Sequence, residues 1–167
     1  FADGLPVLID VGVETYTAKT FGPDRYDIWT MQSAYHNLPT VGGVQQAPGR
    51  EFAARDVTGE TSAGEARLSL DIAGAYPPEA GIRTWRRDIS LARGFTTHIV
   101  VRDRFRLERP AEVTLSLMTP RTPDLSASGI IRLPVPDAPG RAARITIDGW
   151  DSAEVESERI AITDARL

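Results

Sequence analysis

An apolar side chain occupies every second position of the stretch Ala66-Arg67-Leu68-Ser69-Leu70-Asp71-Ile72. Successive side chains of a β-strand point to opposite faces of the sheet, so this alternation is typical of a strand with one buried and one exposed face. The stretch therefore predicts a half-buried strand and, with it, a sheet whose outer surface is polar.

The same alternation dominates the chain from residue 64 onward. It predicts further strands over residues 82–92, 96–107, 112–117, 131–135, 144–148 and 160–162. Turn-forming clusters such as Tyr76-Pro77-Pro78 and Ala92-Arg93-Gly94 separate these runs. Many short strands at this spacing, without helices between them, indicate an all-β fold, an antiparallel β-sandwich. A helical turn is expected only over residues 27–36, where apolar side chains are three or four positions apart.

One domain over residues 1–167 is the expected organisation. A chain of 167 residues can bury roughly 70% of its unfolded surface, and no repeat, linker or low-complexity stretch divides it. The chain opens on Phe1-Ala2-Asp3-Gly4, which is typical of a strand end and a turn. We therefore expect residues 1–167 to be part of a longer protein.

Composition excludes several classes of protein. The formal net charge of −4 argues against binding to nucleic acid or to an anionic membrane surface. The absence of cysteine excludes disulfides and thiolate metal sites. Lys19 is the only lysine among the 19 basic residues. Arginine grips carboxylates and sulfates with its planar fork, but a GC-rich genome produces the same bias, so both explanations stay open.

A series of polar motifs distinguishes the first fifty residues. In chain order they are Asp10-Val11-Gly12, Arg25-Tyr26, His36-Asn37, Gly42-Gly43 and Gln45-Gln46. This order resembles the C-terminal β-sandwich of the heparinase II/III-like polysaccharide lyases, which carry Asp-x-Gly at a strand end, an Arg-Tyr loop, His-Asn, a strand, Gly and Gln. The later stretches Arg102-Asp103-Arg104-Phe105 and Leu117-Met118-Thr119-Pro120 are also similar to strands of that family.

The resemblance implies a metal site at Asp10 and His36. In the family the matching residues are ligands of a divalent ion, commonly zinc, and a further histidine lies on a strand upstream of this chain's first residue. Zinc accepts imidazole nitrogen and carboxylate oxygen and needs about four ligands. Zinc is therefore expected in the intact protein, and two ligands alone would hold it weakly. Without the resemblance, Asp10 is a turn-forming residue and His36 a hydrogen-bonded structural one.

The resemblance also implies cleavage of uronic-acid polysaccharides, of heparin, heparan or alginate type, by β-elimination. This reaction needs a neutralised carboxylate, a base for the neighbouring proton and an acid for the leaving oxygen. In the family the chief catalytic groups lie in an (α/α) toroid domain that precedes the sandwich. We therefore expect this chain to supply one cleft wall, to partner its own N-terminal toroid domain and an acidic polysaccharide, and to be inactive alone. A periplasmic or secreted location is implied as well.

Four residues of this chain are expected to line the cleft. Tyr26 is the expected catalytic residue, because Arg25-Tyr26 lies between the two proposed metal ligands; a tyrosine that anchors its own loop is the alternative. Arg25, Asn37 and Gln46 are expected to bind the sugar, although Asn37 and Gln46 can also orient the metal-bound histidine.

Structural roles explain the remaining conspicuous side chains. Trp85 shares a strand face with Ile89 and Leu91, which predicts a core position. His98 has no acidic neighbour in the sequence, so no catalytic role is expected for it. Solvent-exposed strand positions are expected for Arg83, Arg86 and Arg87.

Two other functions are compatible with the sequence. A non-catalytic carbohydrate-binding module would need exposed aromatic side chains, and the aromatic residues that can be placed face the core. A purely structural sandwich would have no site at all.

Overall fold

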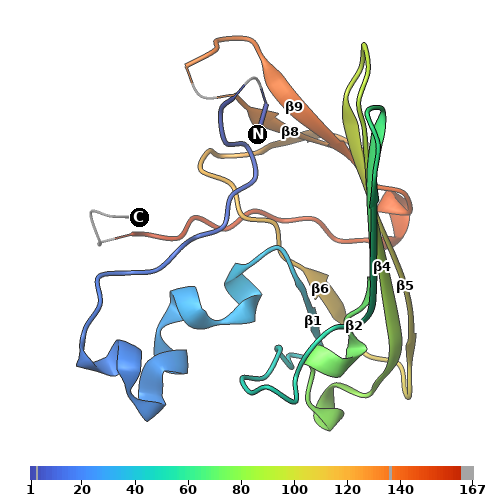
Figure 1. Ribbon diagram of the computed structural model, residues 1–167. Coiled ribbons are helices and arrows are strands. Elements are labelled where there is room, and N and C mark those ends of the chain that lie inside the picture. The colour runs from blue at the N-terminus through green and yellow to red at the C-terminus, as the bar shows by residue number, and fades with distance from the viewer. Residues whose placement is uncertain (3, 136, 163–167) are drawn as a thin grey trace. The chain divides into compact units, whose positions relative to one another are not determined.

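The computed structural model describes residues 1–2, 4–135 and 137–162 (Figure 1). Every pair of neighbouring strands in them is antiparallel. The helices among them are short 3-10 turns, of which the longest is η2 with 5 residues (Pro23–Asp27). The expected fold class, all-β with antiparallel sheets of sandwich type, is confirmed. No helix in the described part of the chain combines the length and the apolar character that a membrane crossing requires.

The chain forms two compact units. The central unit comprises Pro39–Leu115, and the terminal unit comprises Phe1–Leu38 together with Ser116–Leu167. The organisation as a single domain stays a prediction.

A four-stranded sheet dominates the central unit. Its strands follow chain order: β2 (Arg55–Thr61), β3 (Glu65–Asp71), β4 (Ile82–Ala92) and β5 (His98–Leu107). In the middle of the sheet, Leu68 pairs with Ile89 and Ile89 pairs with Val101, so apolar side chains stand in rows across the strands. A separate two-stranded sheet joins β1 (Pro39–Val41) to β6 (Val113–Leu115), and two 3-10 turns, η5 (Ala73–Ala75) and η6 (Pro78–Ala80), connect β3 to β4.

Trp85 is the centre of the core of the central unit, as the alternation predicts. It is 1% exposed and stacks on Phe105 with ring centroids 4.4 Å apart. Val41, Ile72 and Tyr76 belong to the same buried cluster. The Tyr76 hydroxyl donates a hydrogen bond of 2.6 Å to the Pro39 carbonyl, which ties β1 to this core. Burial raises the pKa of Tyr76 to about 12.

The prediction of a solvent-exposed Arg87 is wrong. Arg87 lies on the same face of β4 as Trp85 and is only 7% exposed. Its Nε and Nη2 atoms donate to the two carboxylate oxygens of Asp103 on β5, at 2.8 and 2.6 Å. This bidentate pair satisfies a charge that could not otherwise be buried. Arg83 is exposed and Arg86 is partly exposed, which agrees with the prediction for these two.

A three-stranded sheet lies in the terminal unit. It consists of β7 (Asp124–Ala127), β8 (Ile130–Pro134) and β9 (Ala142–Thr146) in that order. The buried cluster of this unit consists of Val7, Ile131, Leu133 and Val135. A last 3-10 turn, η7 (Trp150–Ser152), follows β9. The strand predicted over residues 160–162 is wrong, because the described residues there have no strand partner.

Four consecutive 3-10 turns form the segment that carries the candidate site. They are η1 (Ala18–Phe21), η2 (Pro23–Asp27), η3 (Trp29–Met31) and η4 (Ser33–Tyr35). Helical structure is thus present where residues 27–36 predicted it, but it is interrupted. Ile28 and Gln32 have extended backbone, with ψ of 119° and 133°, and each ends one turn before the next begins.

Candidate functional site

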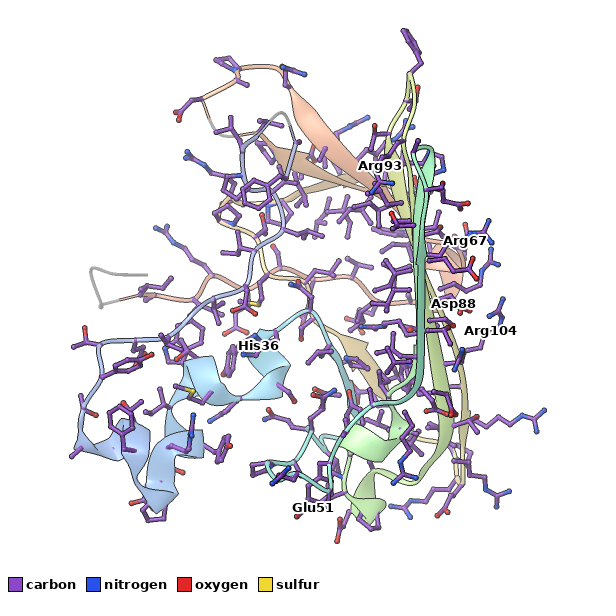
Figure 2. All side chains as sticks on the ribbon, viewed as in Figure 1. His36, Glu51, Arg67, Asp88, Arg93 and Arg104 are labelled. Carbon is purple, nitrogen blue, oxygen red and sulfur yellow. The ribbon has the colours of Figure 1, made fainter. Side chains whose placement is uncertain are left out.

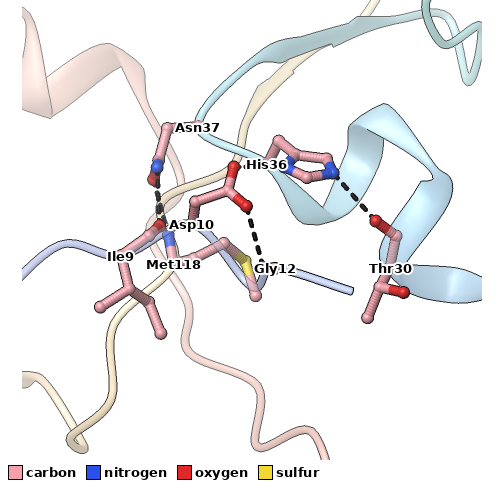
Figure 3. A network of polar contacts seen from close by, with 7 residues as sticks. All are labelled: Ile9, Asp10, Gly12, Thr30, His36, Asn37 and Met118. Atoms are coloured by element: carbon pink, nitrogen blue, oxygen red, sulfur yellow. Dashed lines mark hydrogen bonds and ion pairs between the residues drawn. The ribbon is translucent and has the colours of Figure 1, made fainter. Parts of the chain in front are cut away.

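Asp10 and His36 meet in the terminal unit (Figure 3). The His36 Nδ1 atom lies 2.8 Å from the Asp10 Oδ2 atom, although the two residues are 26 positions apart. The side chain of His36 is 25% exposed and that of Asp10 is 68% exposed, so the pair is open to solvent on the side of the carboxylate. The structure thus brings together the two residues proposed as metal ligands.

A tight turn fixes the Asp10 carboxylate. The Gly12 N–H donates a 2.8 Å hydrogen bond to Asp10 Oδ1, which closes a turn in which Gly12 has a φ of 68°. A left-handed backbone of this kind favours glycine, and that explains the Asp-x-Gly spacing. The Gly12 hydrogen bond, helped by His36, holds the pKa of Asp10 below its ordinary value. Asp10 therefore presents an ionised carboxylate to the imidazole ring.

The other ring nitrogen of His36 contacts the backbone. His36 Nε2 lies 3.1 Å from the Thr30 carbonyl oxygen, which can only accept a hydrogen bond, so Nε2 is the donor in this contact. Nδ1 is then the ring nitrogen that faces Asp10. The Thr30 carbonyl was not predicted as part of the site, because a backbone oxygen leaves no mark in the sequence.

Asn37 holds the surrounding backbone segments together. Its Nδ2 donates to the Ile9 carbonyl, and its Oδ1 accepts from the Met118 N–H, both at 2.9 Å. The Ile9 N–H in turn donates to the Met118 carbonyl at 2.9 Å. Asn37, the neighbour of His36, is therefore tied to Ile9, the neighbour of Asp10, and to Met118. Both of these contacts are to backbone atoms, which favours a positioning role over a sugar-binding one.

Arg25 and Tyr26 lie together in η2. The Arg25 guanidinium lies over the Tyr26 ring, 5.3 Å from its centroid, and Arg25 Nη2 is 3.8 Å from the Met31 sulfur. Tyr26 is 42% exposed. The Tyr26 carbonyl accepts a 2.9 Å hydrogen bond from Gln32, which anchors the turn through its backbone.

Gln46 belongs to the central unit, whereas Asp10, Arg25, Tyr26, His36 and Asn37 belong to the terminal unit. Its side chain hydrogen-bonds the Tyr76 hydroxyl, which belongs to the core of that unit. Its placement thus supports a structural role within the central unit.

The chemistry of Asp10 and His36 fits one half of a zinc site. Zinc takes imidazole nitrogen and carboxylate oxygen, and a ligating histidine commonly donates its second N–H to a carbonyl oxygen. His36 has this arrangement, with Nδ1 towards Asp10 and Nε2 towards Thr30. Within residues 1–2, 4–135 and 137–162, no group of three or more His, Cys, Asp or Glu side chains gathers at one point. Further ligands would have to come from outside this set.

Comparison with known proteins gives no assignment. No family model matches the chain, and no curated protein matches it significantly.

Proposed function

We propose that residues 1–167 are the C-terminal β-sandwich part of a polysaccharide lyase of the heparinase II/III-like kind, which cleaves uronic-acid glycans by β-elimination. The contact between Asp10 and His36 carries this proposal. The resemblance requires these two residues to share one site, and the fold brings them to 2.8 Å across 26 positions of sequence. A periplasmic or secreted location belongs to the same proposal.

Asp10 and His36 would hold a divalent ion, commonly zinc in this family, together with ligands from the longer protein. The ion would supply structural stability by joining the turn after Asp10 to the segment after η4. This chain's own residues prepare that role. Gly12 and Thr30 fix the orientation of the two ligands, and Asn37 holds their backbones.

Tyr26 and Arg25 would form the part of the cleft wall that meets the glycan. A partly exposed phenol can take or give a proton at the reacting sugar, and a guanidinium beside it can pair with a uronate carboxylate. The chief catalytic groups would be supplied by a preceding toroid domain, so the chain alone is expected to be inactive.

Zinc binding by this chain is expected to depend on His36 and not on His98. These are the two histidines of the sequence, and His98 is exposed on β5 without a partner in the described residues. We expect weak binding of Zn²⁺ by the chain, measured by isothermal titration calorimetry, because two ligands are fewer than the about four that zinc needs.

His36→Gln and Asp10→Asn are expected to weaken this binding at least about tenfold, as is usual for the loss of a ligand or its supporting partner. His98→Gln is the matched control and should bind as the original chain does. Equal zinc affinity in His36→Gln and His98→Gln would contradict a metal role for the pair.

Lyase activity is expected only when the chain is joined to its upstream domain. The measurement is the ultraviolet absorbance of the unsaturated product formed from heparan, alginate and related uronates. The longer protein should produce it, and residues 1–167 alone should not. Clear turnover by the chain alone would show that the toroid is not needed and would refute this division of roles.

The two rival functions give different results in the same assays. A purely structural sandwich predicts no lyase activity in the longer protein and a zinc content that Asp10→Ala and His36→Ala leave unchanged. A carbohydrate-binding module predicts affinity for a glycan in the chain alone without turnover in the longer protein.

A further inference from the structure

A groove of about 500 Å³ crosses the polar face of the sheet in the central unit. It runs over all four strands, from Thr58 and Glu60 on β2, past Arg67 and Ser69 on β3 and Asp88 on β4, to Arg102 on β5. This volume lies within the range of small-molecule sites, which is roughly 300–1,000 Å³. Figure 2 shows Arg67, Asp88 and Arg104 pointing away from the same face of the sheet.

The arginines of this face are unequally neutralised. Arg67 pairs with Glu65 at 2.8 Å, and Arg104 pairs with Asp88 at 2.6 Å. Arg102 lies directly opposite Asp88 in the strand register. Within the described part of the chain, however, the Arg102 side chain has neither a hydrogen bond nor an ion pair. Asp88, which faces Arg102 across the two strands, thus pairs with Arg104 instead.

Asp88 is committed to other partners at both of its oxygens. The Ser69 hydroxyl donates to its Oδ1 atom, and Arg104 Nη1 donates to its Oδ2 atom. The Ser69 hydrogen bond and the Arg104 charge hold the pKa of Asp88 below its ordinary value. Asp88 therefore stays ionised, and its two contacts leave the planar fork of Arg102 available for a carboxylate brought by a ligand.

The rest of the groove selects among anionic ligands. Thr58 and Ser90 offer hydroxyl groups, and the carboxylate of Glu60 can accept hydrogen bonds. A polyphosphate offers no donors to Glu60 at neutral pH, whereas the hydroxyls of a sugar can donate to it. A ligand that carries both hydroxyl groups and a carboxylate can therefore contact Glu60 with the hydroxyls and Arg102 with the carboxylate.

We propose that this groove is a binding site for an acidic oligosaccharide, in which Arg102 receives a uronate carboxylate and Glu60 and Ser90 receive sugar hydroxyls. The site lies wholly within the central unit and uses none of the residues of the Asp10–His36 pair. It therefore does not rest on the lyase proposal, although both point to the same class of glycan.

The test is binding of a purified hexameric oligomannuronate to residues 1–167, measured by isothermal titration calorimetry. We expect Arg102→Gln to weaken the affinity about 10- to 100-fold, because a charge-assisted bidentate contact is lost. The substitution removes no side-chain hydrogen bond or ion pair within the described residues, so the fold is expected to persist. Arg144→Gln, on the exposed face of β9, is the matched control and should leave the affinity unchanged.

Two further ligands test the selectivity. Cellohexaose, a neutral hexasaccharide, should bind at least about tenfold more weakly than the uronate, and so should inorganic tripolyphosphate. The proposal is overturned if the uronate does not bind, if Arg102→Gln binds it as tightly as the original chain, or if either comparison ligand binds equally well. His36→Gln should retain uronate binding, so failure of the lyase proposal would leave this result intact.

Discussion

Arg87→Met is expected to lower the free energy of unfolding by about 3–5 kcal/mol, because it leaves the partly buried Asp103 carboxylate without its guanidinium. The side chains of Arg87 and Asp103 are only 9% and 16% exposed, and two short hydrogen bonds join them. Methionine has a similar length and no charge, so the change mainly removes the pairing. Chemical denaturation followed by circular dichroism measures the effect.

The exposed pair on the opposite face of the same two strands is the matched control. The side chains of Arg104 and Asp88 are 59% and 38% exposed, and Arg104→Met should cost less than about 1 kcal/mol. The double variant Arg87→Met with Asp103→Leu should recover most of the stability, since no buried charge remains. Equal losses for Arg87→Met and Arg104→Met would show that burial does not determine the strength of the pair.

Hydrophobic alternation predicts the strands that have one buried face, and β4 illustrates why. Trp85, Ile89 and Leu91 point to one side, and the structure places Trp85 in the core. Arg87 shares that side, and the same alternation assigns it to the buried face. A charged side chain such as that of Arg87 is usually exposed to solvent. Whether it is buried or exposed here depends on Asp103, its partner on the neighbouring strand. That partner is 16 positions away and is not visible in the local pattern.

Strand β2 could not be predicted from alternation. All 7 of its residues are exposed, and it is an edge strand with a register irregularity between Arg55 and Thr58. Charged residues and an irregular register are usual on edge strands, where they oppose pairing with other chains. Residues 160–162 show the reverse case. Ile160 and Ile162 alternate, but alternation cannot supply a neighbouring strand.

The candidate site depended on long-range contacts, so local pattern predicted its residues and not its geometry. The Asp-x-Gly motif alone indicates a turn, and the structure has that turn at Asp10. The contact with His36 and the Asn37–Met118 hydrogen bond join positions 26 and 81 residues apart. Only the order of motifs, through its resemblance to a family, suggested the pair. Gln46 was predicted from the same order of motifs, but its side chain hydrogen-bonds Tyr76 in the central unit.

Trp85→Ala is expected to lower the free energy of unfolding by about 3–5 kcal/mol, the range for removing a large buried aromatic side chain. Trp85 is 1% exposed, and its ring stacks on Phe105 with an interplanar angle of 15°. Its loss would leave a cavity beside Val41 and Tyr76, which belong to the same cluster. The measurement is again chemical denaturation, and Phe95→Ala is the control, since Phe95 is fully exposed in the turn between β4 and β5.

Trp85→Phe separates the ring from the indole N–H. The Trp85 Nε1 atom is buried and has no hydrogen-bond partner among the described residues, and an unsatisfied donor of this kind costs about 1–3 kcal/mol. Phenylalanine keeps an aromatic face for Phe105 and removes this donor, so the two effects oppose each other and the net loss should be at most about half that of Trp85→Ala. If both variants lost the same stability, the volume of the indole, rather than its stacking on Phe105, would hold this core together.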